Sequence, residues 1–175
     1  MLKGSIVAII TPFKNDTLDQ DNYVNLIDYH LKNGTNGIVP GGTTGESPTL
    51  SHNEHKRIIE IAVKECKGKI PVIAGTGSNS TVEAIDLSKF AEKAGSDALL
   101  VVTPYYNKPT QEGLYQHYKK INDNVGIPII IYNIPSRSVI DMSIDTMKKL
   151  FELKNIVGVK DATGDLNRVD QQLKA

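Results

Sequence analysis

The chain contains a single cysteine, Cys66, among its 175 residues. An internal disulfide and a cysteine-based metal cluster are therefore excluded. The sequence also has no run of 18 apolar residues, and no basic segment followed by a short apolar one at its start. We therefore expect a soluble, unexported protein that resides in the cytoplasm and does not enter a membrane.

The chain has no excess of positive or of negative charge. Lys and Arg together number 20, as do Asp and Glu, so the formal net charge is zero. No run of Lys and Arg forms a basic patch, and we expect no nucleic-acid partner. The length suits one ordinary domain that can bury a sizeable core.

Six short apolar runs are present, and most of them are continuous rather than alternating with polar residues. Continuous runs of Val, Ile and Leu are typical of strands buried on both faces, and such strands are usually parallel. The six predicted strands cover residues 5–10, 37–39, 71–74, 97–102, 127–132 and 156–160.

Helical patterns separate these runs. Apolar residues recur near a 3.6-residue period in 19–33, 52–67, 81–94, 111–124 and 144–153, and a further helix begins at 166–175. Ser51 with Glu54, and Ser80 with Glu83, have the spacing of capping boxes at two helix starts.

The order is strand then helix, repeated about six times, which predicts a parallel α/β fold. Two closures are possible, an open doubly wound sheet and a (β/α) barrel. A complete eight-unit barrel needs roughly 200–250 residues or more, so the length by itself favours the open sheet.

The loops after the predicted strands contain the unusual residues, and in parallel α/β proteins ligands meet these loops. The loop GGTTGESPTL, residues 41–50, places three glycines around Thr43 and Thr44. Its backbone N–H groups and hydroxyls could hold a small carboxylate. The same pattern also fits a plain glycine-rich turn, and it lacks the Gly-Lys-Ser/Thr ending of a phosphate-binding loop.

Tyr132 and Lys160 end two consecutive predicted strands. If those strands pair, the two side chains start roughly 5 Å apart. A desolvated lysine is a nucleophile toward carbonyls, and a tyrosine beside it can relay protons, which suggests imine chemistry on a small keto acid. The alternative is a lysine that extends to solvent and a tyrosine that packs.

His52 and His55 resemble a possible metal pair, three residues apart at a helix start. No third ligand has an obvious place beside them, so we expect no metal site and interpret both as solvated histidines.

The same loops resemble a known family. The chain is similar to dihydrodipicolinate synthases (4-hydroxy-tetrahydrodipicolinate synthases), a branch of the N-acetylneuraminate lyase type of pyruvate-dependent class I aldolases. The matching stretches follow the family's order along nearly the whole chain: GSIVAIITPF (4–13), GGTTGESPTLS (41–51), PVIAGTGSNST (71–81), TPYYNKPTQEGLYQHY (103–118), YNIPSR (132–137) and GVKDATGD (158–165).

The resemblance implies a (β/α)8 TIM barrel in place of the open sheet. Chains of the family are longer, so we expect residues 1–175 to form a single partial barrel domain, truncated to about six β/α units. Strands seven and eight and the C-terminal helices would be absent. The unpaired edges of the first and sixth strands would then be an aggregation hazard.

The resemblance also implies roles for individual residues. Lys160 matches the lysine that forms a Schiff base with pyruvate. Tyr132 matches the proton-relaying tyrosine, Thr43 the threonine that links it to a second tyrosine, and Tyr106 that second tyrosine. Thr44 and Arg137 match the residues that hold the carboxylates of pyruvate and of L-aspartate 4-semialdehyde, since a guanidinium offers a two-pronged donor.

The implied reaction condenses pyruvate with L-aspartate 4-semialdehyde to 4-hydroxy-tetrahydrodipicolinate, the first committed step of lysine synthesis through diaminopimelate. It requires no metal and no organic cofactor. A related lyase acting on N-acetylneuraminate or a keto-deoxy sugar acid is the runner-up. An inactive remnant that only associates with other subunits is the third reading.

Regulation and assembly also follow from the resemblance. L-Lysine would act as a feedback inhibitor, and the family assembles as a homotetramer that is a dimer of dimers. The residues that match the lysine site of sensitive members are Ser47, His52, His55, Asn79, Glu83 and Tyr105.

Overall fold

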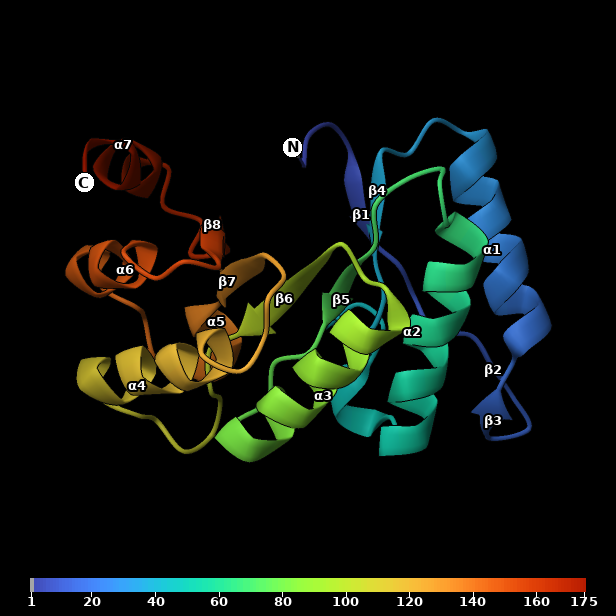
Figure 1. Cartoon of the computed structure of the whole chain (residues 1–175), viewed down its shortest axis with the longest axis horizontal. Helices are drawn as coiled ribbons and strands as arrows, with labels where there is room; N and C mark the ends of the chain where they lie inside the picture. The colour runs from blue at the N-terminus through green and yellow to red at the C-terminus, as the bar shows by residue number, and fades with distance from the viewer. Residues whose placement is uncertain (1) are drawn as a thin grey trace. The chain divides into compact units, whose positions relative to one another are not determined.

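The computed structural model describes residues 2–175, which divide into two compact units. The first unit comprises the chain up to Thr76 together with Phe90–Leu99. The second comprises Gly77–Lys89 together with Leu100–Ala175. Each unit is described by itself below, and Figure 1 gives the element labels.

The first unit is built on parallel strands flanked by helices. Strand β1 (Ile6–Ala8) pairs in parallel with β4 (Gly37–Val39), and Ile38 forms a parallel bridge to Val72, just before β5 (Ile73–Gly75). Helices α1 (Gln20–Lys32) and α2 (His52–Cys66) contact each other, as Figure 1 shows. The predicted capping box forms at the start of α2, where Ser51 and Glu54 bond each other reciprocally.

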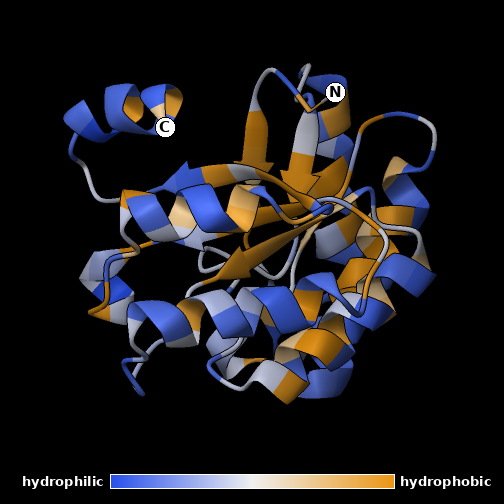
Figure 2. Cartoon of the chain, turned by 60° about the vertical axis from the view of Figure 1, so that its left-hand side comes forward, coloured by the Kyte–Doolittle hydropathy of each residue, from blue (hydrophilic) through white to orange (hydrophobic). Residues whose placement is uncertain are grey.

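One apolar cluster forms the core of this unit. It joins the inner faces of α1 and α2 to the strands and consists of Ile9, Tyr23, Ile27, Ile38, Ile58, Ile61, Ala62, Cys66 and Val72. Figure 2 shows the expected hydropathy pattern, in which strands are mostly hydrophobic and helices carry both kinds of residue.

In the second unit, β7 lies between β6 and β8 in the sheet and pairs in parallel with β8. Strand β6 (Ala98–Val102) begins in the first unit, and its last three residues belong to the second. Strands β7 (Ile129–Asn133) and β8 (Ile156–Asp161) lie wholly in the second unit. The helices that accompany this sheet are α3 (Thr81–Ala94, which ends in the first unit), α4 (Gln111–Asn122), α5 (Pro135–Ser138), α6 (Ile144–Phe151) and α7 (Asn167–Lys174).

The core of the second unit lies between α4, α6 and the strands, and α4 contacts α6 directly. Tyr118 of α4 is fully buried and donates its hydroxyl to the carbonyl of Val101 at 2.7 Å. The hydrogen bond satisfies a polar atom that would otherwise be costly to bury. Within the described residues, no helix combines the length and the apolar character that crossing a membrane requires.

All six predicted strands and all six predicted helices are present, with ends that differ by a few residues. The patterns missed a small antiparallel hairpin in the first unit, β2 (Phe13–Lys14) with β3 (Thr17–Leu18). Its two turn residues, Asn15 and Asp16, both have positive φ, 51° and 57°. Asn and Asp tolerate that conformation, and a two-residue loop of this kind is a recognisable hairpin signal in the sequence.

Candidate active site

Lys160 and Tyr132 lie on neighbouring strands in register. Strands β7 and β8 pair in parallel, and Tyr132 is the direct partner of Lys160. The Nζ atom of Lys160 lies 4.1 Å from the centroid of the Tyr132 ring, within the range of a cation–π contact. From the sequence, this contact depended on the pairing of the two strands. The pairing is confirmed, and the amine contacts the aromatic ring.

The environment of this pair differs from the sequence expectation. Tyr132 is buried, but Lys160 is exposed, and Val157 on the same strand is 52% exposed. The prediction that this strand is buried on both faces is wrong. Among the described residues, strand β8 is the last strand of its sheet and has β7 as its strand neighbour.

Arg137 and Tyr106 lie in the second unit, on segments that follow β7 and β6. Arg137 is exposed in the last turn of the short helix α5, which begins at Pro135, a residue suited to the first helical position. Tyr106 is 88% exposed and has a φ of 71°, an uncommon value for a residue other than glycine. Neither helix α5 nor this backbone conformation was predicted from the sequence.

Thr43 and Thr44 lie in the first unit, in the glycine-rich turn that follows β4. Three backbone amides of this turn form hydrogen bonds within it. Those of Gly45 and Ser47 donate to the Gly42 carbonyl, and that of Glu46 donates to the Thr43 carbonyl. None of these three bonds uses the amide of Thr43 or Thr44. These two amides are therefore the candidates within the turn for holding an anion.

Three residues predicted for lysine binding also lie in the first unit. Ser47 opens a short 3-10 helix, η1 (Ser47–Thr49), and His52 is exposed at the start of α2. His55 is buried, with its Nε2 2.7 Å from the carbonyl oxygen of Gly75. The expectation that both histidines are solvated is therefore wrong for His55, because its side chain faces the strands.

The other three lysine-site residues lie in the second unit. Asn79 accepts a hydrogen bond from Asn107 at 3.1 Å through its backbone carbonyl, which joins its loop to the loop of Tyr105. Glu83 accepts a hydrogen bond from the Ser78 hydroxyl. At the predicted capping box of Ser80 and Glu83, the Glu83 amide lies 3.5 Å from the Ser80 hydroxyl, which is one of the two expected bonds.

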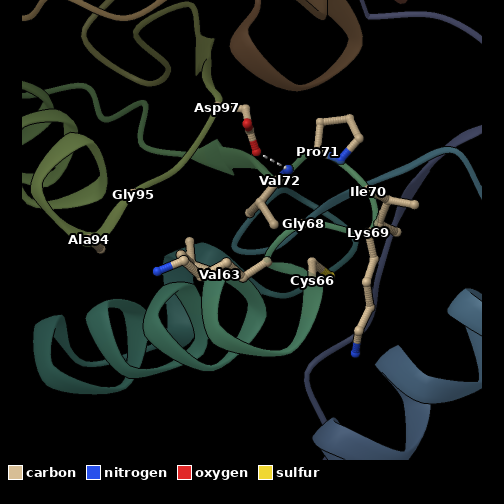
Figure 3. Close-up of a pocket in the computed structure, with 11 residues that line it drawn as sticks. Val63, Cys66, Gly68, Lys69, Ile70, Pro71, Val72, Ala94, Gly95 and Asp97 are labelled. Carbon is tan, nitrogen blue, oxygen red and sulfur yellow. Dashed lines mark hydrogen bonds between the residues drawn. The ribbon is translucent and has the colours of Figure 1, made fainter.

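No group of three or more His, Cys, Asp or Glu side chains gathers as a metal site within residues 2–175. The described chain does contain a pocket of about 340 Å³, which Figure 3 shows. It lies in the first unit between the end of α2, the segment before β5 and the end of α3, and it contains none of the candidate residues. Asp97 closes one side by accepting the Val72 amide at 2.8 Å.

Cys66 lines this pocket but is almost fully buried. Burial raises the pKa of its thiol to about 11, which Lys69 opposes and Glu65 and Asp97 reinforce. Because the thiolate is the nucleophilic form, this cysteine is a structural residue rather than a reactive one.

Comparison with known proteins places this geometry in context. The 4-hydroxy-tetrahydrodipicolinate synthase of Pelagibacter ubique is 74% identical over 172 residues, which are 98% of this chain and 59% of that protein. The chain therefore spans somewhat over half the length of the curated relatives that it matches.

Two solved structures extend the comparison. The dihydrodipicolinate synthase of Acinetobacter baumannii, a chloride-inhibited form complexed with pyruvate, has a TM-score of 0.97 and 52% identity, covering 99% of this chain and 60% of that one. The enzyme of Cyanidioschyzon merolae with lysine bound has a TM-score of 0.94 and 39% identity, covering 98% and 60%.

The α/β fold of parallel β/α units thus matches the barrel structures of these proteins over about 60% of their length, which confirms the expected fold class and overturns the open sheet that length favoured. The model of the dihydrodipicolinate synthetase family matches residues 1–175. The chain belongs to the dihydrodipicolinate synthetase family.

Proposed function

We propose that this chain carries the imine-forming site of a 4-hydroxy-tetrahydrodipicolinate synthase. The observation that carries the proposal is the position of the Lys160 amine over the Tyr132 ring, on paired strands, in a chain 74% identical to such an enzyme. An accessible amine beside a phenol is what imine chemistry on a keto acid requires.

The reaction begins when the neutral amine of Lys160 attacks the ketone carbon of pyruvate, and water leaves as the imine forms. Loss of a methyl proton converts the imine to an enamine, whose carbon attacks the aldehyde of L-aspartate 4-semialdehyde. The amine of that second substrate then displaces Lys160 by transimination and closes the ring. The lysine is regenerated, and no metal or organic cofactor takes part.

The remaining residues assist these steps. Tyr132 moves protons to and from the reacting oxygen and carbon, with Thr43 and Tyr106 completing the relay. Thr44 helps to hold the carboxylate of pyruvate, and Arg137 binds the carboxylate of the semialdehyde with its guanidinium. The pyruvate complex of the Acinetobacter baumannii relative supports the first substrate.

L-Lysine inhibits the enzyme by feedback at a separate site in this proposal. The site consists of Ser47, His52, His55, Asn79, Glu83 and Tyr105. The lysine-bound relative from Cyanidioschyzon merolae supports it. Titration of the enzyme with L-lysine measures this inhibition directly. Unchanged activity at millimolar lysine would refute this part of the proposal.

For the intact protein we propose a cytoplasmic homotetramer, a dimer of dimers, of which residues 1–175 form a partial barrel domain. The chain covers 59% of the Pelagibacter ubique relative, so the activity is assigned to the whole enzyme, to which this chain contributes Lys160 and its partners.

Trapping with borohydride tests the proposal. The chain is incubated with pyruvate and sodium borohydride, which reduces an imine to a stable amine, and intact mass and peptide mapping locate the adduct. We expect one reduced pyruvyl group on Lys160. Lys160→Arg should abolish it, while Lys154→Arg, an exposed lysine just before β8, should not.

A melting curve accompanies each sample. A folded chain without an adduct on Lys160 would refute the proposal and leave the inactive remnant standing. A further assay offers either L-aspartate 4-semialdehyde or a sugar aldehyde as the second substrate. Turnover of the sugar aldehyde alone would favour the runner-up lyase.

A further inference from the structure

A polar network lies on the far side of the strand pair that bears Lys160 and Tyr132. Asn133 follows Tyr132, Asp161 follows Lys160, and the two are themselves partners in the β7–β8 register. Because successive side chains of a strand point to opposite faces, Asn133 and Asp161 face away from the amine and the phenol.

Asn133 is fully buried, and both polar atoms of its side chain form hydrogen bonds. Its Nδ2 donates to Asp141 Oδ1 at 2.8 Å, and its Oδ1 accepts the Met142 amide at 3.1 Å. Its backbone carbonyl accepts the Ala162 amide at 2.8 Å, which extends the β7–β8 pairing beyond Asp161. The end of β7 is thereby joined both to the segment after α5 and to the residue that follows β8.

Arg168 of α7 connects this segment to β8 through three bonds. Its Nε donates to Asp161 Oδ2 at 2.9 Å, its Nη1 to Asp141 Oδ2 at 3.1 Å, and its Nη2 to the Met142 carbonyl at 2.9 Å. Gln172, one turn later, donates to the same Asp161 oxygen at 2.7 Å. A guanidinium can serve three acceptors in this way because its donors have a fixed planar geometry.

The bridge between Arg168 and Asp161 is shielded from water. The two side chains are only 12% and 14% exposed, in contrast to the pair of Lys32 and Asp28 at 73% and 51%. Burial alone would raise the pKa of the Asp161 carboxyl, but hydrogen bonds from Thr163 and Arg168 outweigh it and hold that pKa below its ordinary value. Shielded, charge-assisted bonds of this kind fix geometry more firmly than exposed pairs do.

Helix α7 has no buried residue, and Leu166 and Leu173 beside and within it are exposed. Apolar packing therefore contributes little to its attachment. Its Arg168 and Gln172 side chains supply the contacts that hold it against β8. Among the described residues, β8 pairs with β7, and the contacts from α7 reach β8 at Asp161, the residue after Lys160.

We propose that Arg168, Asp161, Asp141 and Asn133 form a positioning network that holds Lys160 over Tyr132. The inference rests on the proposed function, because it assigns the network a purpose in imine formation. None of the four touches the substrate; they act through the backbone of β7 and β8. A small misplacement of a nucleophile is costly to rate even when the fold is retained.

Arg168→Gln tests the network, because it removes the charge and replaces three donor nitrogens with one, so the three connections cannot all be made. We expect the maximal rate of pyruvate trapping on Lys160 to fall about tenfold, with the half-saturating pyruvate concentration within about twofold of its original value. Amide hydrogen exchange of residues 156–162 should speed up, while that of residues 98–102 stays unchanged. Arg57→Gln is the matched control, since Arg57 pairs with Gln20 and Glu60 at the surface.

A conservative pair of variants separates positioning from simple folding. The Thr163 amide donates to Asp161 Oδ1 and Arg168 Nε donates to Asp161 Oδ2, so Asp161→Asn keeps one of these two acceptors and Asp161→Ala keeps neither. Asp161→Asn should therefore retain a larger share of the trapping rate than Asp161→Ala. Trapping and exchange are both measured well below the melting temperature of each variant.

The outcomes are distinguishable. If the unmodified chain traps pyruvate and Arg168→Gln traps it equally fast, the positioning network is refuted and the proposed function stands. If Asp161→Asn and Asp161→Ala lose the same share of rate, the network is refuted as well. If the folded, unmodified chain forms no adduct on Lys160, the proposed function fails and the inference falls with it.

Discussion

The Nζ of Lys160 lies 4.1 Å from the centroid of the Tyr132 ring, and the two residues are direct partners across the β7–β8 ladder. The ring therefore has two separable roles, contact with the amine through its face and proton transfer through its hydroxyl. Substitutions that remove one role at a time follow from this geometry.

Tyr132→Phe keeps the ring and removes the hydroxyl. We expect pyruvate trapping on Lys160 to slow by about 100-fold, the lower range for loss of a positioned proton-transfer group, with little change in melting temperature. Tyr132→Ala also empties a buried site and should lower the free energy of unfolding by about 3–5 kcal/mol. Equal trapping rates in Tyr132→Phe and the unmodified chain would contradict the proton-relay role.

His117 of α4 makes stability depend on pH. Burial lowers its pKa to about 4 from an ordinary 6.5, and its Nδ1 lies 2.9 Å from the Thr81 hydroxyl. Between these values the unfolded chain binds a proton that the folded chain does not. Protonation therefore favours the unfolded chain as the pH falls below 6.5. The free energy of unfolding decreases toward pH 4, by about 3 kcal/mol in total.

Urea unfolding at pH 7 and at pH 5 measures this effect. His117→Gln should flatten the difference between the two conditions, although it lowers stability at pH 7. His52→Gln is the control, because His52 is exposed on α2. A difference of the same size in His117→Gln and the unmodified chain would show that other groups cause it.

Two glycines allow a matched test of close packing in the first unit. Gly41 and Gly68 both have positive φ, 64° and 74°, so a side chain strains the backbone similarly at either, by about 1–2 kcal/mol. A Cβ on Gly41 would lie 2.6 Å from His55 Nε2, whereas one on Gly68 meets nothing within 4 Å.

Gly41→Ala should therefore cost clearly more stability than Gly68→Ala, and it should disturb the contact of His55 with Gly75. Chemical denaturation of both variants gives the comparison. Equal costs would mean that the loop moves aside without loss.

Cys66 should resist thiol reagents in the folded chain. Its side chain is 1% exposed and burial raises its pKa to about 11, so little thiolate is present or reachable at pH 8. We expect negligible labelling by a disulfide reagent in buffer and complete labelling in denaturing urea. Rapid labelling of a folded sample would show that the pocket beside Cys66 opens.

The regular part of the fold was predictable because its signals are local. Continuous apolar runs and helical periods identified six strands and six helices, and Ser51 with Glu54 located the start of α2 correctly. The hairpin at Asn15 and Asp16 was missed because its strands are only two residues long. The exposure of β8 was missed because an apolar run does not reveal whether anything covers it.

The sequence by itself determined the order of β/α units, the family, and the identities of Lys160 and Tyr132 as the residues that end two consecutive strands. The tertiary structure alone decided that those strands pair in register, that Lys160 is exposed and His55 buried, and that Arg168 bridges Asp161 to Asp141. The physical reason is that pairing, burial and bridging join residues far apart in the chain, and periodicity reports only what lies within a few residues.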